Sequence, residues 1–126
     1  MRILLDTHVL LWWLQDNPRL RPKARGMIAD TSNTVVISVA TPWEISVKHR
    51  IGKMKESGAV IMGAVVDQGI TVLDLTCEHL KILEAMPLLH RDPFDHLIIA
   101  QALAERCVIV TDDAAFEAYS VPCIPA

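Results

Sequence analysis

Arg2–His8 (RILLDTH) places a short apolar run directly before an acidic residue. The run over residues 2–5 is typical of a buried strand, and Asp6 follows at its carboxyl end. We expect a helix over about residues 8–15, with Thr7 as its N-cap. A buried strand, an acid and a helix in direct succession indicate the first unit of an α/β protein.

The rest of the chain alternates in the same way. Further strands are predicted by β-branched or apolar runs at residues 34–39, 70–73, 108–110 and 121–124, and prolines weaken the last of these as an edge strand. Helices are predicted over residues 22–30, 41–51, 57–68, 76–86, 93–106 and 114–119. This alternation predicts an α/β sandwich around a parallel sheet, formed by residues 1–126 as one domain.

Composition narrows the classes of function. An apolar fraction of 52% argues against disorder and suggests a further apolar face that meets another protein. No segment approaches the ~20 continuous apolar residues of a membrane span, and the charge at Asp6 comes too early for a secretory signal. With three cysteines and no CxxC pair, we expect reduced, mostly buried thiols in a cytoplasmic protein.

The net charge of −3 argues against a generally basic nucleic-acid binder. Two local clusters are nevertheless basic, one within residues 48–55 and one within residues 19–25. Each could guide phosphate groups, although for either cluster alone a solvated helix face is the favoured interpretation.

Four acidic positions that are far apart in the chain are expected at one edge of the sheet. Asp6 and the pair Asp112-Asp113 end strands, whereas Glu44 and Asp95 lie in the first turns of helices that start at the same edge. Carboxylates that converge repel one another unless protons or divalent cations neutralise them. Convergence therefore predicts a magnesium or manganese site of the kind found in phosphoryl-transfer enzymes and nucleases.

Each acid also has a structural alternative. Asp92-Pro93-Phe94-Asp95 reads as a helix start, in which Asp92 is the N-cap and Asp95 belongs to the site. Glu44 could simply pair with Lys48 one turn later.

The remaining acids differ in how readily structure explains them. Asp112 could cap the last helix, which favours Asp113 as the ligand, whereas Asp6 has no evident structural partner. The histidines show no zinc-type spacing and are expected in surface or capping roles: His8, His49, His79, His90 and His96.

Four segments of the chain carry a more specific pattern. They are residues 4–12 (LLDTHVLLW), 42–48 (PWEISVK), 91–102 (RDPFDHLIIAQA) and 110–113 (VTDD). Together and in this order they resemble the PIN-domain family, and within it the VapC-type toxins of type II toxin–antitoxin pairs. The resemblance covers nearly the whole chain.

The resemblance implies a three-layer α/β/α fold with a central parallel sheet. It also implies a metal-dependent endoribonuclease that hydrolyses RNA phosphodiester bonds with a metal-activated water, uses Mg²⁺ or Mn²⁺, forms a homodimer and is held inactive by a cognate antitoxin. The family's catalytic and metal-binding acids correspond to Asp6, Glu44, Asp95 and Asp113.

Other positions are given supporting roles by the same resemblance. Thr111 corresponds to a polar residue that could bond a ligand acid or water, and Asp112 could share the task of the fourth acid. His96 departs from the family, because relatives commonly carry arginine at this position, so no phosphate contact is carried over to it.

Trp12 and Trp13 point about 100° apart on a short helix that is apolar on most sides. Such a helix needs to be covered, either by a partner, here an antitoxin segment, or by ordinary burial within the fold.

Two other functions remain open: a non-catalytic PIN-like binding module, and a phosphohydrolase of the haloacid-dehalogenase type. The hallmark second acid of the latter is replaced here by His8.

Overall fold

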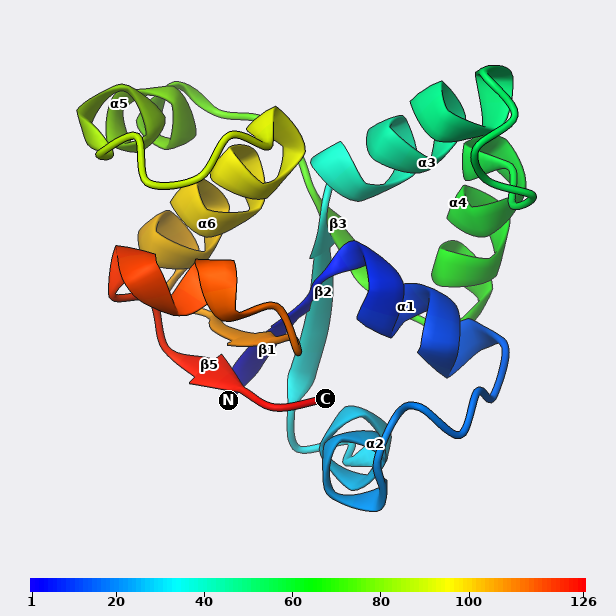
Figure 1. Ribbon diagram of the computed structural model, residues 1–126. Helices are drawn as coiled ribbons and strands as arrows, with labels where there is room; N and C mark the ends of the chain where they lie inside the picture. Colours follow the sequence, from blue (N-terminus) through cyan, green and yellow to red (C-terminus); the bar gives the residue numbers. More distant parts are fainter.

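Five parallel strands form one sheet in the computed structural model, which describes residues 1–126 (Figure 1). In chain order they are β1 (Arg2–Leu5), β2 (Thr34–Ser38), β3 (Thr71–Leu73), β4 (Val108–Val110) and β5 (Cys123–Ile124). Across the sheet the order is β3-β2-β1-β4-β5, so β1 lies in the middle. The predicted parallel sheet is confirmed, and all the strands end at the same edge.

Helices cover both faces of this sheet. They are α1 (Thr7–Leu14), α2 (Pro22–Ala29), α3 (Ala40–Arg50), α4 (Gly58–Asp67), α5 (Cys77–Ala85), α6 (Pro93–Glu105) and the 3₁₀ helix η1 (Ala114–Tyr119). One core contains residues of α1, α2 and α4, and the other contains residues of α6 and η1, with α5 packed against it (Figure 1). This is the predicted three-layer α/β/α sandwich.

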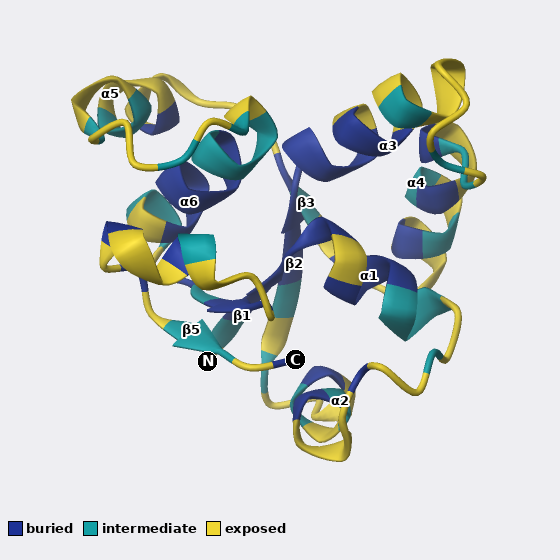
Figure 2. Ribbon diagram, viewed as in Figure 1, coloured by how far each residue is buried: buried dark blue, intermediate teal, exposed yellow.

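The side chains of β1 supply both cores. Ile3 and Leu5 pack with α1, α2 and α4, whereas Leu4 packs with α6 and η1. All three are fully buried, as Figure 2 shows for the centre of the sheet. Successive side chains of a strand point to opposite faces, so a continuous apolar run is what a strand covered on both sides requires.

The start of α1 differs from the sequence prediction by one residue. Asp6, not Thr7, is the N-cap, because Asp6 Oδ1 accepts a hydrogen bond from the Val9 amide at 2.9 Å. Thr7 becomes the first helical residue, which frees its hydroxyl for another partner. The acid that ends β1 therefore also starts α1.

The three cysteines are free thiols, but only one of them is buried, whereas most were expected to be. Cys107 is buried and Cys123 is half-buried, whereas Cys77 is exposed as the first residue of α5. Burial raises the pKa of both Cys107 and Cys123, so neither is a reactive thiolate. None of the helices has the combination of length and apolar composition that crossing a membrane requires.

Gly58 is expected to tolerate no side chain. A Cβ at this position would collide with the side chain of Ser46 and the carbonyl oxygen of Pro42, where α4 meets α3. Gly58→Ala should therefore lower the free energy of unfolding by about 1–3 kcal/mol, measured by urea denaturation.

Gly63 in the same helix provides the matched control, since a Cβ there meets nothing within 4 Å. Gly63→Ala should stabilise the protein by about 0.5–1 kcal/mol through helix propensity alone. Equal effects of the two substitutions would show that α3 and α4 do not make this close approach.

Candidate metal centre

A small cavity opens at the carboxyl edge of the sheet. It lies where the strand order reverses, between the ends of β1 and β4, the usual place for a ligand in an open α/β sheet. Its volume is about 110 Å³, and it is lined by Asp6, Thr7, His8, Glu44, Lys48, Asp92, Asp95, Asp113 and Phe116. The four acids expected to converge, which come from four separate segments of the chain, thus surround one cavity.

Asp6 holds the ends of two strands together. Besides capping α1, it accepts a hydrogen bond on Oδ2 from the hydroxyl of Thr111, which follows β4. The expectation that Asp6 has no structural partner is therefore wrong. Burial raises the pKa of Asp6 and the nearby Asp113 adds to this, whereas the bonds from Thr111 and Val9 lower it.

Glu44 is buried, with 5% of its surface exposed, and both carboxylate oxygens have donors. The Thr7 hydroxyl donates to Oε1 at 2.7 Å, and Lys48 Nζ donates to Oε2 at 2.6 Å. The bond to Glu44 is the main reason why the pKa of Lys48 is raised. The structural alternative considered for Glu44 is thus present, and it lies inside the cavity rather than apart from it.

Asp95 stands in the first turn of α6. Asp92 precedes it as the N-cap and accepts the amides of Phe94 and Asp95 at 2.9 and 3.3 Å, as predicted. The carboxylate of Asp95 instead meets His90, whose Nε2 lies 2.9 Å from Asp95 Oδ2. Burial raises the pKa of Asp95 to about 6, with Asp92 and Glu44 adding to the shift and His90 opposing it.

Of the two acids after β4, Asp113 lies at the cavity as predicted, but it also takes the capping role that was expected of Asp112. Asp113 caps η1 by accepting the Ala115 amide at 2.9 Å, and it also lines the cavity. Asp112 does not cap this helix, because its Oδ1 accepts hydrogen bonds from Arg21 Nη2 and the Ala126 amide, both at 2.8 Å. These donors turn Asp112 away from the cavity.

His90 is the cavity neighbour that sequence reasoning missed, because it was assigned with the other histidines to surface or capping roles. A ring nitrogen of His90 and carboxylate oxygens of Asp95 and Asp113 lie within 4.8 Å of one another. One feature of the sequence could have indicated this role, because His90 comes shortly before a helix whose first turn carries the site acid Asp95. His79 does take the expected capping role, in a capping box with Thr76, although it is buried.

The charge in this cavity is strongly unbalanced. Five carboxylates line it, and Lys48 supplies the only ammonium group. Asp95 Oδ1 and Asp113 Oδ2 accept no hydrogen bond from the protein, which leaves both atoms free for another partner. Carboxylate oxygens are the ligands that Mg²⁺ and Mn²⁺ prefer, so the donor set fits such an ion.

The basic clusters are partly used within the structure. Arg21 pairs with Asp112, and Arg25 pairs with Asp16 at 2.5 Å and donates to the carbonyl of Asn17. The other cluster behaves differently, because its first member, Lys48, points into the acidic cavity.

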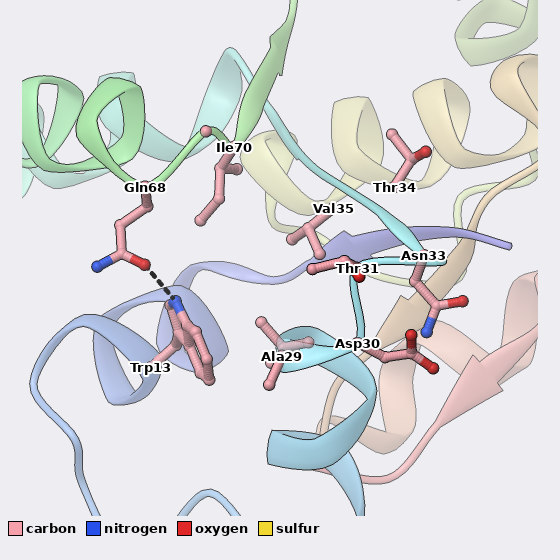
Figure 3. A pocket seen from close by; sticks show the side chains of 11 residues that line it. Trp13, Ala29, Asp30, Thr31, Asn33, Thr34, Val35, Gln68 and Ile70 are labelled. Carbon is pink, nitrogen blue, oxygen red and sulfur yellow. Dashed lines mark hydrogen bonds between the residues drawn. The ribbon is translucent and has the colours of Figure 1, made fainter.

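The largest cavity lies elsewhere. It has a volume of about 460 Å³ and is bordered by Thr34 and Ile70, at the amino ends of β2 and β3 (Figure 3). Trp13 forms part of its wall and donates from Nε1 to Gln68 Oε1 at 3.3 Å (Figure 3). None of the four acids lines it, so size alone would point away from the acidic cavity.

A three-layer α/β/α fold with carboxylates gathered at the switch point of its sheet is the architecture of an α/β protein with a candidate metal site. Comparison with known protein families identifies the family. The PIN domain model matches residues 3–122, and the chain therefore belongs to the PIN domain family, whose members are generally nucleases. No curated protein matches the sequence.

Solved structures show the same fold. VapBC2 from Rickettsia felis bound to a promoter DNA fragment matches with a TM-score of 0.77 and 18% identity, covering 99% of this chain and 98% of that chain. DNA-bound VapBC from Salmonella typhimurium gives 0.71 and 18%, over 99% and 98%. FitAB bound to an IR36 DNA fragment gives 0.65 and 19%, over 98% and 94%.

Asp95→Asn is expected to stabilise the metal-free protein above about pH 6. The pKa of Asp95 is about 6 in the folded state, against about 3.9 in an unfolded chain, so the folded state binds more protons between these values. The stability contributed by the protonated carboxyl is complete below about pH 4 and is lost as the pH rises through 6. Melting curves from pH 4 to 8 without divalent cations should show the Tm of wild type falling relative to that of the variant.

Asp74→Asn is the matched control, because Asp74 is exposed and its carboxylate has no hydrogen-bond partner. That variant should follow wild type across the whole range. A constant difference in Tm between wild type and Asp95→Asn at all pH values would contradict the raised pKa.

Proposed function

We propose that this PIN-domain protein is a Mg²⁺- or Mn²⁺-dependent endoribonuclease and the toxin of a toxin–antitoxin pair. The observation that carries the proposal is the gathering of Asp6, Glu44, Asp95 and Asp113 around one cavity at the switch point of the sheet. Membership of the PIN family supports a nuclease and excludes the haloacid-dehalogenase alternative.

Asp95 and Asp113 are the first ligands we assign, because each has an oxygen without a protein donor. Asp6 and Glu44 would complete the set, with Thr111 positioning Asp6 and Thr7 positioning Glu44. When bound, the metal would lower the pKa of a water molecule and stabilise the charge on the oxygen that departs from phosphorus.

An RNA substrate is favoured by the basic side chains beside the cavity. Lys48 is only half-buried at the cavity, and the exposed basic residues that follow it are His49, Arg50, Lys53 and Lys55. Such a cluster attracts a phosphate backbone even when the net charge of the protein is negative.

An antitoxin partner is supported by the similar structures, which are VapBC and FitAB assemblies. On this chain we assign the contact to Trp12 and Trp13. Both indole rings are only half-buried against the first core, so each keeps surface for a partner.

A homodimer is also part of the proposal. Large apolar side chains remain exposed on α3 and α4, including Trp43, Val60 and Val66, and Leu88 in the α5–α6 connection is 90% exposed. Exposed apolar surface of this extent is typical of a protein that associates with another chain.

RNA cleavage is the decisive test of the enzymatic proposal. Purified protein freed of any partner should cleave structured RNA when Mg²⁺ or Mn²⁺ is present and not when EDTA removes it. Asp6→Asn should reduce the rate on the order of 100-fold or more. Asparagine is as good an N-cap as aspartate, so this variant removes the charge and keeps the start of α1.

Asp74→Asn, which changes an exposed carboxylate outside the cavity, should cleave at the wild-type rate. Equal cleavage by wild type and Asp6→Asn would indicate a contaminating nuclease. A folded protein that binds metal but never cleaves RNA would instead favour the non-catalytic binding module.

Trp12→Ala and Trp13→Ala should each weaken the affinity for the cognate antitoxin, measured by titration calorimetry. A buried aromatic anchor at an interface is commonly worth 2 kcal/mol or more. Because both rings also pack on the core, the melting temperature of each variant must be measured alongside. Unchanged affinity in both variants would remove α1 from the proposed interface.

A further inference from the structure

His90 is held in place by three bonds to its own backbone region. The Tyr119 hydroxyl accepts the amides of Leu89 and His90, at 3.0 and 2.8 Å. The ring of His96 donates from Nε2 to the carbonyl oxygen of His90. The segment before α6 is therefore fixed where the imidazole of His90 can reach the acids.

The position of this imidazole suits a metal ligand. Two neighbouring ligands of an octahedral ion with bonds of about 2.1 Å lie about 3.0 Å apart. His90 Nε2 lies 2.9 Å from Asp95 Oδ2, and an oxygen of Asp113 completes a group within 4.8 Å. A single ion could thus be bound by these three residues without a rearrangement of the backbone.

The remaining contacts of His90 do not compete with this role. Its other ring nitrogen has no hydrogen-bond partner in the protein, and its ring forms a T-shaped pair with the ring of His96, at 6.3 Å between centroids. The contact with Asp95 alone engages Nε2. The side chain is half-buried, which leaves it within reach of an ion entering the cavity.

We infer that His90 is a nitrogen ligand of the metal centre, and that it makes this site prefer Mn²⁺ and similar transition ions over Mg²⁺. The assignment rests on the proposed metal site at Asp95 and Asp113. An imidazole nitrogen is a softer donor than a carboxylate oxygen, so it adds more to the binding of transition ions than to that of Mg²⁺. His96 and Tyr119 are then positioning residues for His90. This gives a role to His96, which stands where relatives commonly carry arginine.

Pulsed electron paramagnetic resonance of bound Mn²⁺ tests this ligand directly, because it detects coupling to a coordinating ¹⁴N nucleus. The protein is used without a histidine tag and in a nitrogen-free buffer. We expect ¹⁴N coupling in wild type and its loss in His90→Gln, with Mn²⁺ affinity reduced about tenfold or more and Mg²⁺ affinity nearly unchanged.

His8→Gln is the discriminating variant, because His8 is the histidine that lines the cavity itself, whereas His90 lies beside it next to Asp95. Coupling that disappears with His8→Gln and persists in His90→Gln would overturn the assignment, as would wild type without any coupling. RNA cleavage with Mn²⁺ but no coupling leaves the proposed nuclease standing and refutes the ligand. Coupling without RNA cleavage supports the His90 ligand and counts against the proposed nuclease. A protein that binds no Mn²⁺ refutes both the ligand and the nuclease.

A double-mutant cycle tests the positioning role of Tyr119. Tyr119→Phe keeps the buried ring and removes the acceptor of the Leu89 and His90 amides. It should lower Mn²⁺ affinity in wild type but not in His90→Gln, because the two losses act through the same imidazole. Equal losses in both backgrounds would show that Tyr119 acts on the fold and not on His90.

Discussion

The pairing of β1 with β2 on one side and β4 on the other is the constraint on which the rest of the structure depends. Because β1 is central and parallel to both neighbours, its end brings Asp6 beside Thr111, and the bond between them joins two strand ends. The helices that start at this edge then bring Glu44 and Asp95 toward the same point. The acidic cavity is therefore a product of sheet topology, and no local motif could build it alone.

Gathering carboxylates in this way costs free energy in the metal-free protein, and the fold offsets the cost differently for each acid. Asp6 and Asp113 accept hydrogen bonds from amides of the helices that they cap, and Glu44 accepts one from the ammonium group of Lys48. Asp95 receives an imidazole. A protein selected for stability alone would replace several of these acids. The residual repulsion is one of the reasons for proposing that a divalent cation binds in the cavity.

Much of this could be predicted from the sequence, because it depends on local patterns. The alternation of strands and helices, the Asp92 cap and the Glu44–Lys48 pair all follow from spacings of a few residues. The failures involve partners far away in the chain. The Thr111 donor of Asp6 is 105 residues distant, and Arg21, which draws Asp112 aside, is 91 residues distant. His90 was missed because its orientation depends on the bonds that Tyr119 and His96 make to the backbone of its loop, and this loop has no periodic sequence pattern.

Residues that are more than 100 positions apart in the sequence meet at the cavity, and this has a consequence for protein synthesis. Asp6 is made near the beginning, whereas Thr111, which holds it, and Asp113 are made near the end. On the ribosome β1 can pair with β2 early, but its second neighbour does not yet exist. Long-range parallel pairing of this kind is also slow to form. Any activity of the cavity must therefore begin only after the chain has been made through Asp113 and has folded, so a product that stalls before Asp113 cannot contain the complete set of acids.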